Sequence, residues 1–461
     1  MKKHKYESYK KLFRQCINII TLLMLLAIFA ETWYNKFNTY AERGFENKGN
    51  LLMLAIYFMV LWLSFSLWDA SKVGYETFIN VIASQFFAVV FTNIIMMFQI
   101  TLLIGNVFYM VIILKEVFFI VLKEFILCVI ITGSGTVIYK KLFPPYRVLQ
   151  INGYHKNYLK NKVNSRDDKY KICEEISIDA SWEILRNKIV EYDAVLLNDI
   201  PSKDKNRILK YCFEKSVRVY YTPKISDILV KGSEEINLFD SPLYLCRNVG
   251  LSVQETVIKR IMDILISVMG LVITSPILII TAIAIKVYDR GPVFFLQERC
   301  TMNGKVFWIY KFRSMIVDAE KDGKSRPASA KDDRITPVGR VIRATRIDEL
   351  PQLINILKGE MSFVGPRPER VEHMEKYSKE IPEFEYRLRV KGGLTGYAQV
   401  YGKYNTSPYD KLKLDLMYIQ NYSLLLDIKI ILMTIKIIFS KESTEGFTEE
   451  NIRHIRKDDN E

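Results

Sequence analysis

The first 100 residues contain three long apolar runs, IITLLMLLAIFA at residues 19–30, LLMLAIYFMVLWLSF at residues 51–65 and FINVIASQFFAVVFTNIIMMF at residues 78–98. With their flanks, these runs approach or exceed the roughly 20 apolar residues that one bilayer crossing requires. The sequence therefore predicts an integral membrane protein. We place its four N-terminal transmembrane helices within a region covering residues 1–145, near residues 14–33, 51–68 and 78–104 and within residues 107–139.

Basic residues flank this region on both sides, in MKKHKYESYKKLFR at residues 1–14 and in YKKLFPPYR at residues 139–147. The positive-inside rule places both flanks in the cytoplasm, which requires an even number of crossings. Charged residues interrupt the fourth predicted span at positions 115, 116, 123 and 124. Charges at such depth can mark a transport path, so a transporter is one alternative, but we expect these neighbouring opposite charges to pair locally.

The rest of the chain is large enough for soluble domains, since about 300 of its 461 residues remain, which is ample for two cores. Six scattered cysteines without a CxxC and four histidines without a ligand pair give no support to a zinc site, a disulfide scaffold or haem attachment. The formal net charge of +14 suggests nucleic-acid binding only weakly, because many basic residues flank the membrane region and lack interleaved aromatics. We therefore expect no nucleic-acid partner, and soluble domains in a reducing cytosol.

Residues 146–250 have the pattern of a cytosolic βα domain. Apolar strands VLQI, AVLL and VRVYY alternate with the helical segments ASWEILRNKIVEY and KNRILKYCFEK, which predicts a Rossmann-like, CoA-binding-like fold with a parallel sheet. A dinucleotide site needs a glycine-rich turn after the first strand, but Gly153 is the only glycine in INGYHKNYL. We therefore expect a structural or interaction domain; a nucleotide-binding domain is the alternative.

A further apolar segment runs from Ile264 to Ile285 and has basic residues on both sides. Positive charge at both ends favours two cytosolic ends. Ser275 and Pro276 stand in the middle, and proline removes an amide donor and clashes with the preceding turn. We expect a re-entrant membrane helix over residues 257–288 that turns at Ser275-Pro276, with a straight crossing as the alternative.

Two further elements follow. VFFLQERC and KVFWIYKF flank Asn303-Gly304, which predicts a β-hairpin because both turn positions need positive φ. Period-two geometry places Lys311 and Arg313 on one face of its second strand. The segment LLLDIKIILMTIKIIFS at residues 424–440 is typical of a helix lying in the headgroup region, and residues 443–461 are expected to form a mobile charged tail.

The candidate chemistry is concentrated in RITPVGRVIRATRIDELPQLINILKGEMSFVGPRPER, residues 334–370. The Asp348-Glu349 pair should lie at the amino-terminal end of a helix over residues 350–358, where the helix dipole favours an ionised carboxylate. Arg343 and Arg346 would lower the pKa of Asp348 further. A carboxylate ringed by guanidinium groups is suited to attack phosphorus; a solvated helix cap is the alternative.

The segment GPRPER adds a constrained arginine, because two prolines stiffen the backbone about Arg367 and reduce the entropy lost when its side chain binds phosphate. A rigid turn with an exposed arginine is the alternative. KGGLTGYAQVYGKYN, residues 391–405, contains glycines that would let backbone amides approach a nucleotide. The residues of this expected nucleotide loop are Pro366, Pro368, Gly393 and Gly396.

Together these motifs resemble the bacterial polyprenyl-phosphate sugar-1-phosphate transferases, also called large monotopic phosphoglycosyl transferases. The resemblance covers residues 254–442, the expected catalytic domain, and follows seven motifs in order. They are KRIMDILIS, the Ser275-Pro276 break, GPVFFLQER, NGKVFWIYKFRSM, DDRITPVGRVIR, DELPQLINILKGEMSFVGPRP and GLTGYAQVYG. The chain departs from the family pattern in having Gly392 where proline is common and Arg346 where serine is frequent.

The resemblance implies transfer of a hexose 1-phosphate from a UDP-sugar to undecaprenyl phosphate, with release of UMP, a Mg²⁺ cofactor and a role at the start of capsule, exopolysaccharide or O-antigen synthesis. Asp348 matches the family's nucleophile, and Glu349 matches the acid that helps to hold Mg²⁺, with Asp348 as a second metal ligand. The residues expected to bind substrate phosphates are Lys311, Arg343 and Arg367, with Arg313 and Arg346 beside them.

The expected fold class is thus membrane α plus α/β: four transmembrane helices, a βα domain without a glycine-rich turn, and an α/β catalytic domain anchored by a re-entrant helix. The expected location is the bacterial inner membrane, with the catalytic domain facing the cytoplasm and contacting the lipid bilayer. A homodimer and other polysaccharide-assembly proteins are compatible further partners. A non-enzymatic membrane scaffold or regulator of polysaccharide assembly is the alternative function, and the identity of the sugar stays open.

Overall fold

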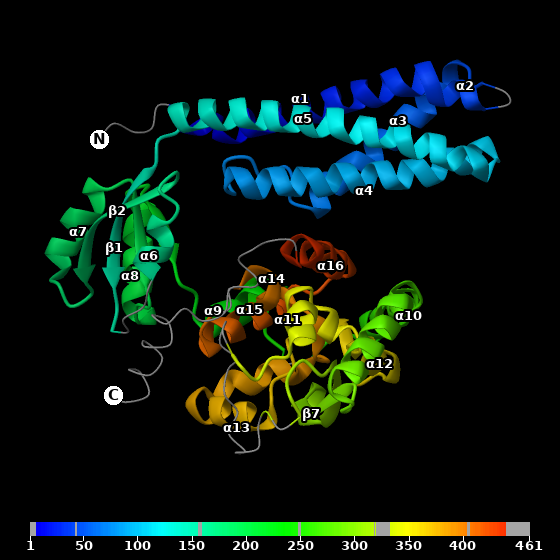
Figure 1. The fold of residues 1–461 in the computed structure, drawn as a ribbon. Coiled ribbons are helices and arrows are strands. Elements are labelled where there is room, and N and C mark those ends of the chain that lie inside the picture. The colour runs from blue at the N-terminus through cyan, green and yellow to red at the C-terminus, as the bar shows by residue number, and fades with distance from the viewer. Residues whose placement is uncertain are drawn as a thin grey trace. The chain divides into compact units, whose positions relative to one another are not determined.

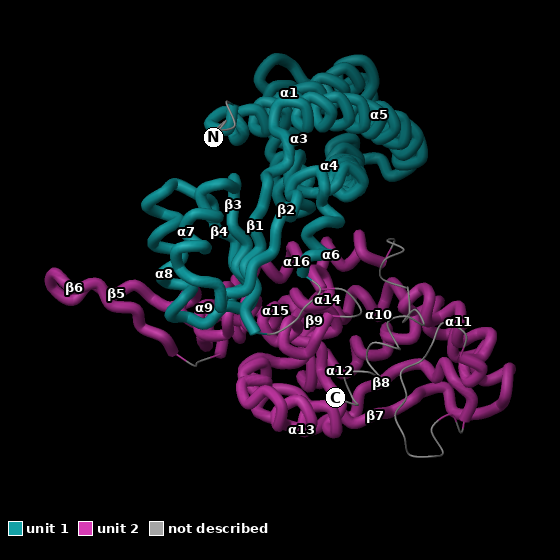
Figure 2. Tube along the Cα trace, turned by 90° about the vertical axis from the view of Figure 1, so that its left-hand side faces the viewer, with its two compact units in different colours: residues 1–223 teal, residues 224–461 magenta. Residues whose placement is uncertain are grey.

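A computed structural model describes residues 6–41, 44–154, 159–247, 250–317, 319, 332–402 and 406–438. The chain divides into two compact units, Met1–Pro223 and Lys224–Glu461, which Figure 2 distinguishes by colour. The predicted mobile tail at residues 443–461 lies outside the described residues.

Four long apolar helices form the first part of unit 1 and run alongside one another (Figure 1). They are α1 Lys10–Thr32, α3 Asn47–Leu67, α4 Phe78–Ile104 and α5 Met110–Leu142. Each is long and apolar enough to cross a membrane, and each lies within a few residues of a predicted span. Short helical segments adjoin them: η1 Glu7–Tyr9, η2 Trp33–Phe37, α2 Asn38–Tyr40 and η3 Val107–Tyr109.

Charged residues of α5 pair with the earlier segments η2 and α1, whereas the sequence predicted local pairing between neighbours in the chain. Glu116 accepts a hydrogen bond from Lys36 Nζ at 2.5 Å, and Lys123 Nζ lies 3.8 Å from a carboxylate oxygen of Glu31. Glu124 is fully buried among the helices and accepts hydrogen bonds from a tyrosine and an asparagine side chain. Ion pairs between helical segments thus account for Glu116 and Lys123, and hydrogen bonds inside the bundle account for Glu124.

The start of α1 and the chain that leaves α5 lie together. Lys10 Nζ donates to Tyr146 Oη at 2.9 Å, and Glu7 contacts both Tyr146 and Arg218. Both ends of the four-helix region therefore lie on one side of it, which is the arrangement that an even number of crossings predicts.

The second part of unit 1 is the expected βα fold. Its four strands are all parallel, in the order β2-β1-β3-β4. The sequence prediction missed β2, an edge strand whose residues alternate between partly buried and exposed. Gly153 packs so closely that a Cβ there would lie 1.9 Å from the Asp199 carbonyl oxygen. The bounds are β1 Tyr146–Asn152, α6 Leu159–Asn164, β2 Tyr170–Ser177, α7 Trp182–Glu191, β3 Ala194–Asn198, α8 Ser202–Glu214 and β4 Arg218–Tyr221.

The boundary of this domain falls earlier than residue 250. Helix α9, Ile225–Lys231, belongs to unit 2, because Ile225 and Ile228 are buried in one apolar cluster with Phe384 and Leu412. A short antiparallel hairpin, β5 Glu234–Leu238 and β6 Ser241–Leu245, follows within the same unit.

Helix α10, Val253–Asp289, is helical throughout and contains Pro276. Pro276 has no amide to donate to the carbonyl of Val272 one turn earlier, and Ser275 Oγ donates to that carbonyl oxygen at 2.8 Å instead. This hydroxyl provides a local substitute for the missing amide, and the turn expected at Ser275-Pro276 stays a prediction.

The rest of unit 2 surrounds the candidate site. The predicted hairpin is confirmed, with φ of 59° at Asn303 and 74° at Gly304. The helix predicted at residues 350–358 is present and ends at Gly359, whose φ is 85°. The elements are β7 Phe294–Cys300, η4 Met302–Gly304, β8 Val306–Phe312, α11 Pro337–Ala344, η5 Ile347–Glu349, α12 Gln352–Lys358, β9 Ser362–Val364, α13 Val371–Glu380, η6 Pro382–Arg389, β10 Gly393–Thr395, α14 Tyr397–Tyr401, α15 Pro408–Gln420 and α16 Leu424–Ile438.

Candidate active site

The two adjacent carboxylates lie on a short turn between two helices. Asp348 and Glu349 form the end of η5, which starts after Arg346 in the left-handed conformation with φ of 58°. Pro351 then caps α12. The turn thus presents both acids just before a helix amino terminus, close to where the sequence placed them.

Glu349 joins two of the predicted phosphate-binding residues. Its Oε1 accepts hydrogen bonds from Lys311 Nζ at 2.9 Å and from Arg367 Nη2 at 2.5 Å. The carboxylate is 12% exposed. Lys311 comes from the end of β8 and Arg367 from the loop after β9, so three segments distant in sequence meet at one carboxylate.

The electrostatics differ between the two acids. Burial alone would raise the pKa of Glu349, but Arg367 and Lys311 outweigh it and hold this pKa well below its usual value. Burial and then the neighbouring charge of Glu349 raise the pKa of Asp348, and Lys311 and Arg343 offset this only in part. Arg343 and Arg346 thus lower the pKa of Asp348, as the sequence predicted, but the expected net lowering is wrong because burial dominates.

Asp348 keeps a carboxylate oxygen without a partner. Its Oδ1 is buried and accepts no hydrogen bond from any described residue. An unsatisfied buried carboxylate oxygen costs folding free energy, and such a cost is common where a group is reserved for a ligand or a reaction. Arg343 and Arg346 are near enough to favour the charged form of Asp348.

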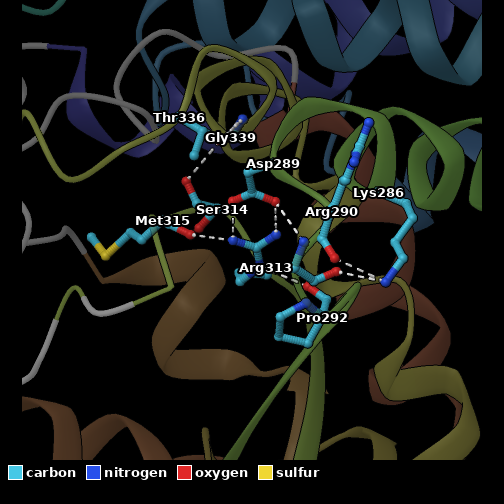
Figure 3. A network of polar contacts seen from close by, with 10 residues as sticks. Lys286, Asp289, Arg290, Pro292, Arg313, Ser314, Met315, Thr336 and Gly339 are labelled. Carbon is cyan, nitrogen blue, oxygen red and sulfur yellow. Dashed lines mark hydrogen bonds and ion pairs between the residues drawn. The ribbon is translucent and has the colours of Figure 1, made fainter.

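Arg313 does not join this cluster. Its two terminal nitrogens face the Asp289 carboxylate, each 2.5 Å from one oxygen, and its Nε donates to the Pro292 carbonyl oxygen at 2.6 Å (Figure 3). Arg313 is 7% exposed. These contacts argue against the predicted phosphate contact for Arg313. They show instead that Arg313, which follows β8 in the chain, binds the end of α10.

The glycines of the expected nucleotide loop have a packing role. A Cβ on Gly393 would lie 2.1 Å from the Gly365 nitrogen, and one on Gly396 would lie 2.1 Å from the Gly365 carbonyl oxygen. Strands β9 and β10 pair here in parallel. The close approach of two backbones therefore explains both glycines without a nucleotide.

Sequence reasoning missed a set of buried charges behind Arg367. Arg387 and Asp415 form an ion pair at 2.7 Å and are both about 2% exposed. Arg299 donates to the Pro368 carbonyl oxygen at 3.1 Å. The strand around Arg299 also contains Gln297 and Glu298 and gives no distinct signal. Nothing in the sequence pattern around Arg387 indicates that it is buried.

The two acids fit a Mg²⁺ site. Mg²⁺ is commonly held by one or two carboxylates while water and substrate phosphates complete its shell. Asp348 Oδ1 is a buried oxygen to which no described residue donates a hydrogen bond. The described part of the chain contains no group of three or more histidine, cysteine, aspartate or glutamate side chains that could hold a metal. Substrate oxygens and water would therefore have to supply the remaining ligands.

Comparison with known proteins identifies the family of this fold and site. Residues 254–441 match the model of the bacterial sugar transferases. A UDP-glucose:undecaprenyl-phosphate glucose-1-phosphate transferase of Caulobacter vibrioides is 40% identical over 191 residues, which are 40% of this chain and 71% of the relative. The chain belongs to the bacterial sugar transferase family.

Two longer relatives are similar over comparable segments. A UDP-N-acetylgalactosamine-undecaprenyl-phosphate N-acetylgalactosaminephosphotransferase of Aeromonas hydrophila is 40% identical over 266 residues, 54% of this chain and 60% of the relative. A UDP-glucose:undecaprenyl-phosphate glucose-1-phosphate transferase of Klebsiella pneumoniae is 43% identical over 230 residues, 47% of this chain and 48% of the relative. The matches thus span about half the length of these two relatives.

Proposed function

We propose that this protein transfers a sugar 1-phosphate from a UDP-sugar to undecaprenyl phosphate, as the first membrane step of a bacterial polysaccharide pathway. The observation that carries the proposal is the juxtaposition of a buried Asp348 oxygen, which has no partner in the described part of the chain, with the Glu349, Lys311 and Arg367 cluster. The names of the relatives support both substrates.

The proposed reaction has two displacements at one phosphorus atom. A carboxylate oxygen of Asp348 attacks the β-phosphorus of the UDP-sugar, the bond from that phosphorus to the bridging oxygen breaks, and UMP leaves with the bond's electrons. A phosphate oxygen of the lipid then attacks the same phosphorus, and the bond to Asp348 breaks. The aspartate is restored and undecaprenyl-diphosphate sugar is released.

The surrounding cations suit this chemistry. Arg367 is a planar guanidinium that can grip a phosphate by two hydrogen bonds, and Lys311 is a compact point charge beside it. Glu349 keeps both cations in place before substrate arrives. Mg²⁺ held by Asp348 and Glu349 would supply further positive charge to the diphosphate oxygens when bound.

We also propose that α10 enters the membrane and that both of its ends face the cytoplasm. A straight helix of its 37 residues would be roughly 54 Å long. Near its start, Arg260 donates to the carbonyl oxygens of Ile356 and Leu357, and at its end Asp289 pairs with Arg313. All of these partners belong to unit 2, which supports a membrane-dipping helix over one whose ends lie across a bilayer.

The middle of α10 has the surface expected for contact with lipid. Ile273 and Ile280 are 75% and 67% exposed. Such an anchor would hold the catalytic site at headgroup depth, where the lipid phosphate is accessible and a nucleotide sugar can arrive from the cytosol. The proposed location is therefore the bacterial inner membrane, with the catalytic unit on the cytoplasmic side.

The decisive test is UMP release by the purified full-length protein in nanodiscs containing undecaprenyl phosphate, across a panel of UDP-sugars with Mg²⁺. The proposal expects UMP with at least one UDP-hexose and a matching lipid-diphosphate sugar. Absence of UMP across UDP-glucose, UDP-galactose and their N-acetylated and deoxy derivatives would favour the scaffold function. The sugar that gives the highest kcat/KM identifies the donor.

A further inference from the structure

The turn that carries Arg367 is held through its carbonyl groups. The carbonyl oxygens of residues 366–368 accept, in order, from Gly393 N at 2.9 Å, Arg387 Nη2 at 3.0 Å and Arg299 Nη1 at 3.1 Å. The donors come from three separate elements, β10, η6 and β7. Three consecutive peptide groups are thus fixed from three directions.

Carbonyl contacts matter more here than in most turns. Two of the three residues, Pro366 and Pro368, lack an amide hydrogen and can be restrained by backbone hydrogen bonds only through their carbonyl oxygens. The proline rings fix φ, but ψ on either side of Arg367 stays free to vary unless the carbonyls are held. The carbonyl donors therefore determine the direction in which the Arg367 side chain leaves the backbone.

Arg387 is itself rigidly oriented. Its Nε donates to Asp415 Oδ2 at 2.9 Å, and its Nη2 lies 2.7 Å from the same oxygen. Its Nη1 is 3.5 Å from Glu369 Oε1, which also accepts from Lys411 Nζ at 3.1 Å. Burial would raise the pKa of Glu369, but Arg387 and Lys411 lower it to about 2, so this carboxylate stays charged. Asp415 on α15 thus orients the guanidinium that reaches the Arg367 carbonyl.

Arg299 is a partly buried cation with an unusual set of partners. Besides the Pro368 carbonyl oxygen, its Nη2 donates to Gln297 Oε1 at 2.6 Å, while its Nε is buried and donates to no described residue. Burial and then Arg367 lower the pKa of Arg299 to about 10, which leaves it charged at neutral pH. Both of these acceptors are neutral groups, and one of them is the backbone of the Arg367 turn.

We propose that Arg387, oriented by Asp415, and Arg299 are positioning residues that hold Arg367 where it contacts Glu349 and would grip the donor diphosphate. The inference rests on the proposed function, because it assigns Arg367 to the nucleotide sugar. A held arginine loses less conformational entropy on binding phosphate, and a small displacement of a clamping group is costly to the reaction. The alternative is that the buried charges only stabilise the fold.

A double-mutant cycle separates the two roles, because a residue that acts only through Arg367 has no further effect once Arg367 is removed. Arg387→Lys keeps the charge but loses the planar fork that reaches both Asp415 and the carbonyl. We expect this change alone to raise the KM for the UDP-sugar about tenfold with a smaller change in kcat. In an Arg367→Ala background it should change neither constant further.

The same cycle with UDP as the ligand, measured by titration calorimetry, provides a readout independent of turnover. Arg389→Lys is the matched control, since Arg389 is exposed two residues away and should leave KM, kcat and UDP affinity unchanged. Should Arg387→Lys fail to fold, Arg299→Lys replaces it in the cycle, because it disturbs the Pro368 carbonyl without stranding a paired carboxylate. Melting temperature is recorded for every variant.

Two results would overturn the positioning role and leave the proposed function intact. One is a double variant whose losses in KM and UDP affinity equal the sum of the losses in the two single variants. The other is a fall in melting temperature with unchanged KM and UDP affinity. A wild-type protein that neither releases UMP nor binds UDP would overturn the proposed function and this inference with it. Non-additive losses in KM and in UDP affinity support the inference.

Discussion

Asp348 and Glu349 are adjacent in sequence, yet their pKa values are displaced in opposite directions. Glu349 shares one oxygen between Lys311 and Arg367 and is held in its charged form. Asp348 has a buried oxygen without a partner among the described residues, and its raised pKa means that it holds its proton to a higher pH than an ordinary aspartate. Paired acids whose environments separate their pKa values commonly divide the chemical roles of a site between them.

The first prediction concerns the nucleophile. Asp348→Asn should lower UMP release about 10⁴-fold or more, because an amide cannot form the acyl-phosphate bond. Intact-mass analysis of wild type mixed with UDP-sugar and no lipid acceptor should show one added phosphosugar, and the variant should show none. Retained turnover or an adduct in the variant would contradict the assignment.

The second prediction is that the two acids affect stability with opposite dependence on pH. The raised pKa of Asp348 means that ionising it costs stability above its unfolded pKa, so Asp348→Asn should raise the melting temperature at pH 7. This gain should shrink as pH falls towards the unfolded pKa. The lowered pKa of Glu349 contributes stability that is present above its unfolded pKa and is lost as pH falls through its folded value. Glu349→Gln should therefore lower the melting temperature at pH 7 and have less effect in acid.

Calorimetric melting of both variants across pH 4 to 8 checks these signs, with the ordinary pKa of about 4 for a free carboxyl group as the lower reference. Curves that run parallel for the two variants would contradict the opposite shifts. The catalytic rate should rise with pH as Asp348 loses its proton, and the acid limb of the kcat/KM profile should lie above the range of a free aspartate.

The sequence predicted most of the elements, because apolar run length, the Asn303-Gly304 turn and the Pro351 and Gly359 helix limits are local signals. It did not predict which cation pairs with which acid. Lys311 and Arg367 are 56 residues apart in sequence, and they meet at Glu349 only through the tertiary fold. The predicted direction of the Asp348 pKa shift was wrong for the same reason, because the burial of a side chain cannot be inferred from a local motif.

The third prediction concerns Glu349. Glu349→Gln removes the negative charge that holds Lys311 and Arg367, so kcat/KM for the UDP-sugar should fall about 10-fold to 100-fold, as is typical when a supporting charge is removed. The Mg²⁺ titration should shift to higher metal concentration. Glu360→Gln, at a partly exposed position of the same unit, is the control. An unchanged metal titration would count against metal binding by Glu349.

The fourth prediction concerns the Asp289 and Arg313 ion pair. Asp289→Asn removes the charge that faces a guanidinium which is 7% exposed, and because Asp289 itself is exposed, the loss should cost about 1 kcal/mol. The melting temperature should fall clearly, while the KM for the UDP-sugar of the folded fraction should stay unchanged. A large rise in KM without loss of stability would instead restore Arg313 as a phosphate-binding residue.

The last prediction is topological. In a background without the six native cysteines, single cysteines at Val257 and Tyr288, both exposed near the ends of α10, should resist a membrane-impermeant maleimide added to intact spheroplasts and should react after lysis. Arg260 and Asp289 each bind the catalytic unit close to these positions, so the two ends are expected to share one compartment. Ser275→Ala should weaken the helix at Pro276 by removing the hydroxyl that satisfies the Val272 carbonyl. Labelling of one end alone from outside would establish a helix that crosses the membrane, and the catalytic site would then have to be reassigned to one side of it.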